Sequence, residues 1–210
     1  GSFGITYLVS DPAIGTRFAL KEYLPSRFAS RHDDGTVQAI DDESEQLFAN
    51  GLKRFLSEAR LIAALDHPNI VKVLRYFEAN GTAYFLMSYF QGRSLHKLLE
   101  SEGNFDREDA GRMLLPLMDA LEYIHQQGVI HLDIKPANIY MTDKGDPMIA
   151  ADFREAIIFS KEAIARVDRL RAALLGDLED LLDAQVGLGG RRWSHTIGFV
   201  CVTHMQRLAV

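Results

Sequence analysis

Short apolar runs separated by turn-forming residues open the chain, and this pattern is typical of β-strands. Two such runs, at residues 6–9 and 17–22, lie on either side of a turn that contains Gly15, which predicts a β-hairpin. The polar stretch that follows, residues 23–42, contains the dipeptide Asp34-Gly35. We expect this stretch to form an exposed loop or a small second hairpin.

A pattern with helical spacing follows over residues 42–65, and it predicts one long amphipathic helix. The apolar residues of this predicted helix are Leu47, Leu52, Phe55, Ala59, Ile62 and Ala63. Asp42 or Ser44 is expected to cap the helix, because a short polar side chain accepts a hydrogen bond from a free N–H group of the first turn.

Two further apolar runs, residues 70–77 and 83–89, are predicted to be strands. They are joined across Asn80-Gly81, a dipeptide that favours the backbone of a tight hairpin turn. The first half of the chain is therefore expected to be a small antiparallel sheet with one long helix.

The second half of the chain is predicted to be mainly helical. Residues 94–101 and 107–127 show helical periodicity, and the composition of residues 160–185 favours another helix. A short connector at residues 88–92 separates the strand-rich part from the helix-rich part. The expected fold class is therefore α+β, with two lobes.

Composition and charge narrow the range of functions. The chain has 210 residues, of which 47% are apolar and 25% charged, as in ordinary globular proteins. The net charge of −6 argues against nucleic acid as a partner. No apolar run is long enough to span a bilayer, and Cys201 is the only cysteine, so we expect a cytoplasmic protein or a cytoplasmic domain of a larger one. The chain starts at Gly1 without an initiator Met or a signal peptide, and we expect an N-terminal piece to be missing.

The strongest chemical pattern is at residues 131–139, which match H-x-D-x-K-x-x-N. Each fixed position suits phosphoryl transfer: Asp133 can accept the proton of a hydroxyl, Lys135 can neutralise phosphate charge, and Asn138 can offer a neutral oxygen to Mg²⁺. Further along the chain, Asp152 is expected to be a second ligand of the metal, although an aspartate there can also simply end a strand.

Three weaker matches lie in the first half of the chain. The start, Gly1-Ser2-Phe3-Gly4, equals the second half of a G-x-G-x-x-G loop, in which backbone N–H groups approach phosphate oxygens, but it can also be a plain turn. Lys21 can reach phosphates as a point charge, although a lone strand lysine is usually just solvated. Glu58 lies on the inward side of the predicted helix, where a carboxylate needs a cation such as Lys21.

With these motifs, residues 1–156 resemble a eukaryotic-type serine/threonine protein kinase domain of the kind found in bacteria. Further strings support the resemblance: Lys21-Glu22-Tyr23-Leu24-Pro25, Ser57-Glu58-Ala59-Arg60, His67-Pro68-Asn69-Ile70-Val71 and Gly92-Arg93-Ser94-Leu95. The resemblance implies a small lobe over residues 1–87, a hinge and upper large lobe over residues 88–156, and an atypical helical tail over residues 157–210. It also implies ATP and Mg²⁺ as cofactors and a protein substrate with a serine or threonine acceptor.

The resemblance further implies how adenine binds. Met87 would be the gatekeeper, and Ser88 and Phe90 would offer backbone groups of the hinge to the base. Ala19 and Tyr140 would lie above and below it.

The sequence departs from the family pattern in its last third. Leu132 and Arg154 replace an arginine and a glycine of the family motifs, and no A-P-E segment follows Ala156. An incomplete large lobe without an activation segment is therefore expected. Three functions stay open at this point: a protein kinase with impaired activity, a nucleotide-binding pseudokinase or scaffold, and a non-functional kinase fragment.

Overall fold

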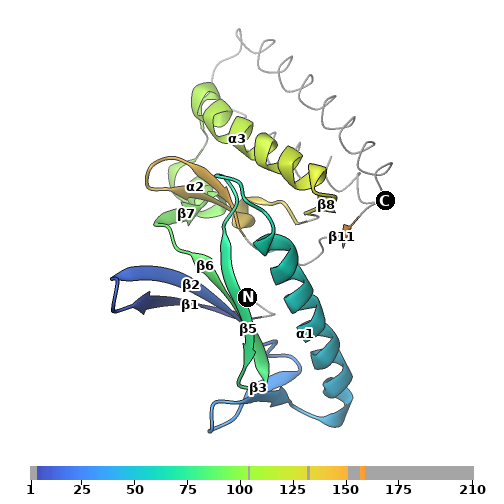
Figure 1. Cartoon of the computed structure of the whole chain (residues 1–210). Coiled ribbons are helices and arrows are strands. Elements are labelled where there is room, and N and C mark those ends of the chain that lie inside the picture. Colours follow the sequence, from blue (N-terminus) through green and yellow to red (C-terminus); the bar gives the residue numbers. More distant parts are fainter. Residues whose placement is uncertain (1–3, 104, 132, 151–156, 159–210) are drawn as a thin grey trace. The chain divides into compact units, whose positions relative to one another are not determined.

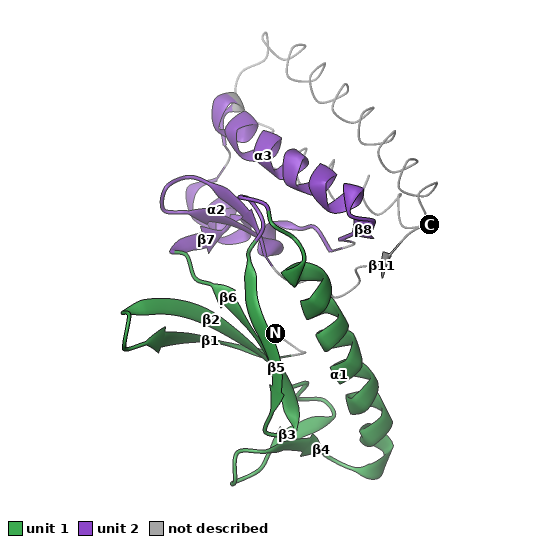
Figure 2. Cartoon of the chain, viewed as in Figure 1, with its two compact units in different colours: residues 1–66, 71–90 green, residues 67–70, 91–210 purple. Residues whose placement is uncertain are grey.

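The computed structural model describes residues 4–103, 105–131, 133–150 and 157–158. The chain divides into two compact units (Figure 2): residues 1–66 with 71–90, and residues 67–70 with 91–210. The first unit holds an antiparallel sheet and one long helix, and the described residues of the second hold two α-helices and short strands. These elements confirm the predicted α+β class.

The first unit is built on a four-stranded antiparallel sheet with the order β1-β2-β6-β5 (Figure 1). Its strands are β1 (Gly4–Asp11), β2 (Thr16–Tyr23), β5 (Val73–Ala79) and β6 (Thr82–Ser88). Both predicted hairpins are confirmed. Asn80 and Gly81 have positive φ angles of 53° and 70°, as the tight turn between β5 and β6 requires.

The long helix is α1 (Asp42–Ala63), which confirms the helix predicted at this place. Its cap is Asp41, rather than Asp42 or Ser44 as expected: Asp41 Oδ1 accepts a hydrogen bond of 2.8 Å from the N–H of Ser44. Asp41 can do this because its backbone is still extended, whereas the other two residues already lie in the helix. Leu47 and Ala63 are exposed, contrary to the predicted apolar stripe, whereas Phe48, about 100° further around the helix than Leu47, packs against the buried ring of Tyr23.

The stretch between β2 and α1 forms the second hairpin, with β3 (Ala29–Arg31) and β4 (Val37–Ala39). The expectation that this stretch is exposed is confirmed for residues 30–34 but wrong for Ala29 and Val37, which are buried in the core. The N–H of Val37 donates a hydrogen bond of 2.8 Å to the carbonyl of Asn80. The small hairpin is therefore fixed to the turn between β5 and β6.

In its described residues the second unit contains two of the three helices predicted for this part of the chain. Its elements are β7 (Gly92–Ser94), α2 (Leu95–Glu102), α3 (Arg107–Gln126), β8 (Val129–Ile130), η1 (Pro136–Asn138), β9 (Ile139–Thr142), β10 (Pro147–Ile149) and β11 (Ile157–Ile158). The strands form two small sheets, β10-β9-β7 and β11-β8. Strand β11 was not expected, and the helix predicted at residues 160–185 lies outside the described residues.

Residues 67–70 belong to the second unit, although they lie between α1 and β5 in the sequence. Asn69 explains this: its Nδ2 donates to the carbonyl of Pro147 at 2.8 Å, and its own carbonyl accepts from the N–H of Ile149 at 2.7 Å. Both ends of β10 are thus bonded to this segment.

Candidate functional site

Lys21 and Glu58 meet within the first unit, as the sequence predicts. Lys21 Nζ lies 3.9 Å from Glu58 Oε1, and the two side chains are only 18% and 11% exposed. The same ammonium lies 5.1 Å from the ring centroid of Phe85, its neighbour across the β2–β6 pairing. A carboxylate and an aromatic face therefore hold this cation at one place on β2.

The residues expected around adenine in the first unit lie along the same sheet. Ala19 pairs with Met87 across β2 and β6, and the Met87 side chain is buried. The N–H of Ser88 donates a hydrogen bond of 3.0 Å to the carbonyl of Lys72, so this N–H is already used within the first unit. Phe90 is the last residue of the unit. Their contacts with a nucleotide stay predictions.

Gly4 is needed for a reason that the sequence did not reveal. A Cβ atom at this position would overlap the backbone oxygen of Glu22 and lie 3.3 Å from its carbonyl carbon. The close approach of β1 to the end of β2 thus already requires a glycine. Gly1, Ser2 and Phe3 lie outside the described residues, so the phosphate loop stays a prediction.

Asp133, Lys135 and Asn138 form a compact cluster in the second unit. Lys135 Nζ donates to both carboxylate oxygens of Asp133, at 2.7 and 2.8 Å. Asn138 Nδ2 donates to Asp133 Oδ2 at 2.8 Å and to the Asp133 backbone carbonyl at 2.9 Å. The backbone of this loop is held as well, because the Asn138 N–H donates to the Lys135 carbonyl at 2.8 Å as the short helix η1 begins. These bonds fix the orientation of the Asp133 carboxylate.

The expected metal ligands are only partly described. Asn138 is buried, and its carbonyl accepts a hydrogen bond of 2.9 Å from the N–H of Ala150. Its side-chain Oδ1 accepts no hydrogen bond from any residue that the structure describes. Asp152, two residues after Ala150 in the sequence, lies outside the described part, as do Leu132 and Arg154. Within that part, no three His, Cys, Asp or Glu side chains gather as a metal site.

Tyr140, the remaining predicted residue, is half-buried in β9. It pairs with Ser94 on one side and with Met148 on the other. Its place against adenine stays a prediction.

A buried polar cluster around Glu22 was missed by the sequence analysis. The Glu22 side chain is 1% exposed, and it accepts hydrogen bonds from the hydroxyls of Tyr7 at 2.7 Å and Tyr84 at 2.6 Å, and from the guanidinium of Arg31. Burial alone raises the pKa of Glu22, but these donors outweigh burial and hold the pKa below its ordinary value. Side chains alternate along a strand, and Glu22 follows Lys21 directly, so the two lie on opposite faces of β2.

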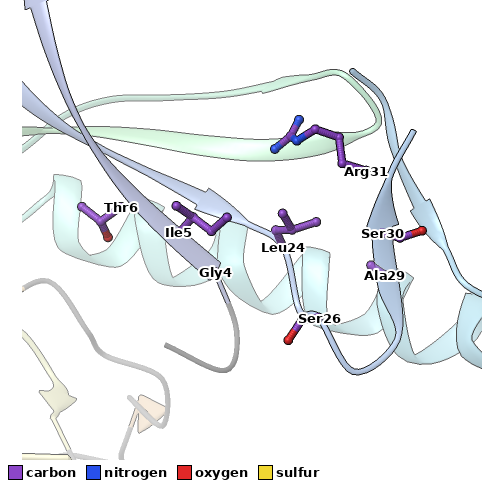
Figure 3. Close-up of a pocket in the computed structure, with 8 residues that line it drawn as sticks. All are labelled: Gly4, Ile5, Thr6, Leu24, Ser26, Ala29, Ser30 and Arg31. Carbon is purple, nitrogen blue, oxygen red and sulfur yellow. The ribbon is translucent and has the colours of Figure 1, made fainter. Parts of the chain in front are cut away.

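A pocket of about 780 Å³ opens beside this cluster (Figure 3). Its lining residues are Gly4, Ile5, Thr6, Leu24, Ser26, Ala29, Ser30 and Arg31. Among them only Arg31 is charged, and its guanidinium is bound to Glu22 and, at 2.9 Å, to the carbonyl of Gly35. Neither Lys21 nor Glu58 lines this pocket, so it is separate from their ion pair.

Comparison with known proteins identifies the family. The protein kinase domain matches residues 1–167 of the chain. The chain belongs to the protein kinase domain family. The match continues past residue 156, where we expected the kinase resemblance to end.

Relatives of this kinase chain come from bacteria and eukaryotes. Serine/threonine-protein kinase B of Synechocystis is 30% identical over 155 residues, which are 73% of this chain and 25% of that protein. A probable myosin light chain kinase of Dictyostelium discoideum is 31% identical over 137 residues, 63% of this chain and 35% of that protein. The solved structure described as the PpkA-294 apo form has a TM-score of 0.70 and 36% identity, and covers 73% of this chain and 54% of the PpkA chain.

These comparisons confirm the predicted resemblance to eukaryotic-type serine/threonine kinase domains of bacteria. The chain spans about a third or less of the length of the two curated relatives described above. In the part of this kinase that the structure describes, no helix is both long and apolar enough to cross a bilayer.

Proposed function

We propose that this kinase chain transfers the terminal phosphoryl group of ATP, bound with Mg²⁺, to a serine or threonine hydroxyl of a protein. The observation that carries the proposal is the cluster of Asp133, Lys135 and Asn138, in which one carboxylate is oriented by a cation and an amide. ATP would supply the phosphoryl group, and Mg²⁺ would neutralise the negative charge of the phosphates. The serine/threonine kinases among the relatives support the same reaction class.

In this proposal Asp133 accepts the proton of the substrate hydroxyl. Its side chain is 24% exposed, so a hydroxyl can reach it from solvent. Asn138 holds one of its oxygens at 2.8 Å, which leaves the carboxylate in one rotamer. Lys135 is 44% exposed and already turned toward this carboxylate, so its charge lies where a phosphate would meet the hydroxyl.

The side chains that are present fit a magnesium nucleotide. Asn138 Oδ1 is a neutral oxygen without a hydrogen bond among the described residues, and Mg²⁺ prefers oxygen ligands. Asp152 would add the negative ligand. Lys21, held by Glu58, would offer its ammonium to the phosphates.

The test is transfer of labelled phosphate from ATP to a generic serine- and threonine-rich protein, with Asp133→Asn beside the unchanged chain. A positioned general base is worth about 10²–10⁴-fold in rate, so we expect Asp133→Asn to lose at least about 100-fold. The matched control is Asp143→Asn, because Asp143 is an exposed carboxylate ten residues further along the same unit. Equal transfer by Asp133→Asn and the unchanged chain would refute the role of Asp133.

Thermal unfolding with and without Mg²⁺ and ATP separates the remaining outcomes. A ligand that binds only the folded state raises the unfolding temperature, and we expect this rise in both the unchanged chain and Asp133→Asn. A rise in the unfolding temperature without any phosphate transfer would indicate a nucleotide-binding pseudokinase. No rise at millimolar ATP would contradict both functions.

A further inference from the structure

Gly51 lies in the middle of α1, at a point where the helix has no room for a side chain. A Cβ atom there would overlap the hydroxyl oxygen of Tyr23 and lie 2.9 Å from its Cζ. Glycine inside a helix is unfavourable by about 1 kcal/mol relative to alanine. The close contact with Tyr23 is therefore the structural reason for a residue that helix formation alone disfavours.

The Tyr23 ring has little freedom to move away from this contact. Its side chain is buried, and its ring centroid lies 5.4 Å from that of Phe48 and 5.5 Å from that of Phe55. Its hydroxyl donates to the backbone carbonyl of Phe48 at 3.4 Å. Phe48, Gly51 and Phe55 follow one another at helical spacing, so a single face of α1 encloses the ring on both sides and at its tip.

This contact is linked to the ion pair of the candidate site by the geometry of both elements. Tyr23 is two residues after Lys21 in β2, so the two side chains lie on the same face of the sheet. Glu58 is seven residues, or about two turns, after Gly51, so both lie on the same side of α1. Phe55 fills the space between, with its ring centroid 4.7 Å from that of Phe85.

We propose that Tyr23 and Gly51 form a seat that sets the distance between α1 and β2 and thereby brings Glu58 to Lys21. Both are positioning residues, because they act through the ion pair. The pair is sensitive to this distance, since Lys21 Nζ and Glu58 Oε1 are already 3.9 Å apart, near the limit of about 4 Å for an ion pair. The effect on ATP rests on the proposed function, whereas the effect on the ion pair does not.

The first test is Gly51→Ala, with Gly111→Ala as the matched control. Both are helical glycines, but a Cβ atom at Gly111 in α3 would meet nothing within 4 Å. The readout is the rate at which an amine reagent acylates Lys21, measured by peptide mass spectrometry against the exposed Lys53. We expect Gly51→Ala to raise the relative labelling of Lys21 several-fold, because the shifted helix withdraws Glu58, and Gly111→Ala to leave it unchanged.

The second test is rescue. Replacing Tyr23 by Phe removes the hydroxyl oxygen, the atom nearest to the new Cβ, but leaves the ring carbon Cζ at 2.9 Å, so we expect Gly51→Ala with Tyr23→Phe to restore the labelling in part. If Gly51→Ala acted only by destabilising the fold, the double variant should be disturbed more than Gly51→Ala alone, because Tyr23→Phe also removes the hydrogen bond to Phe48. Should Gly51→Ala alone not fold, a folded double variant supports the proposal, and an unfolded double variant overturns it.

Activity measurements separate this inference from the proposed function. If both hold, Gly51→Ala lowers kcat/KM for ATP on the order of 10- to 100-fold, as small displacements in active sites do, and Tyr23→Phe recovers part of it. Suppose the variants show the expected changes in Lys21 labelling, but the unchanged chain neither binds ATP nor transfers phosphate. The proposed function would then be refuted, and the role of Tyr23 and Gly51 in positioning Glu58 would stand. Unchanged labelling in a folded Gly51→Ala variant would refute the seat, whatever the activity.

Discussion

Loss of the Arg31 guanidinium leaves a carboxylate in the core without its cation. Removing one partner of a buried ion pair typically costs about 3–5 kcal/mol. Glu22 is 1% exposed, but Arg31 is 35% exposed, and the hydroxyls of Tyr7 and Tyr84 remain as donors. We therefore expect Arg31→Ala to lower the free energy of unfolding by about 2–3 kcal/mol, less than for a fully buried pair.

The effect of pH gives a second, sharper expectation. In the unchanged chain the pKa of Glu22 is lowered, so its stabilisation is present above the pKa of the unfolded chain and is lost as the pH falls through the folded pKa. Without Arg31, only the two tyrosine hydroxyls oppose the effect of burial, so the pKa of Glu22 rises relative to the unchanged chain. The cost of Arg31→Ala should therefore be largest at neutral pH and shrink toward pH ~4.5, where Glu22 is protonated in the variant.

Urea unfolding followed by circular dichroism at both pH values measures this cost. The matched control is Arg93→Ala, because Arg93 and Glu102 form an ion pair in which both side chains are about half exposed, at 55% and 53%. Such pairs contribute at most about 1 kcal/mol. The reasoning fails if Arg31→Ala costs no more than Arg93→Ala, or if its cost does not change with pH. Adding Glu22→Gln should recover part of the loss, because no charge is then buried.

Three further predictions concern single elements. Asp41→Ala should lower the free energy of unfolding by about 1 kcal/mol through loss of the α1 cap, and an equal effect of Asp42→Ala would contradict this assignment. Gly92→Ala should cost about 1–3 kcal/mol in urea unfolding, because its Cβ would overlap a backbone oxygen of β9, whereas Gly111→Ala should be neutral or stabilising. Burial raises the pKa of Tyr23 to about 12, so the stabilisation from its neutral phenol is present below about pH 10 and is lost as the pH rises through 12. The hydrogen bond to Glu22 also raises the pKa of Tyr7, so ultraviolet titration should show more than one late tyrosine, of which Tyr23→Phe removes the component near pH 12; persistence of that component would refute the assignment.

Local sequence patterns were sufficient for most of the elements. Asn80-Gly81 predicted its turn because few residues adopt two successive positive φ angles. The spacing within residues 131–139 predicted the Asp133 cluster because the three side chains belong to one short loop. Glu58 was matched with Lys21 because a carboxylate on the inward side of a helix needs a cation.

The contacts that were missed join residues whose partners no local pattern specifies. The pattern at Glu22 is that of any polar strand residue, and only the fold brings Arg31 and the two tyrosines to it. Gly51 likewise looks unfavourable in a helix until the Tyr23 ring is seen against it. Leu47 was predicted to lie on the buried face of α1 but is exposed. Helical spacing shows which residues share a face, but it does not show how far the core extends along and around the helix.

The assignment of residues 67–70 to the second unit matters to anyone who wishes to express the units separately. A polypeptide cut after Phe90 would carry these residues without β10 and would also lose the 3.1 Å contact between His67 Nε2 and Asp119 Oδ2. Ile70, now buried, would then face water. Isolating the sheet and α1 as a soluble piece therefore calls for a redesigned link between Asp66 and Val71, and a simple truncation is the wrong starting point.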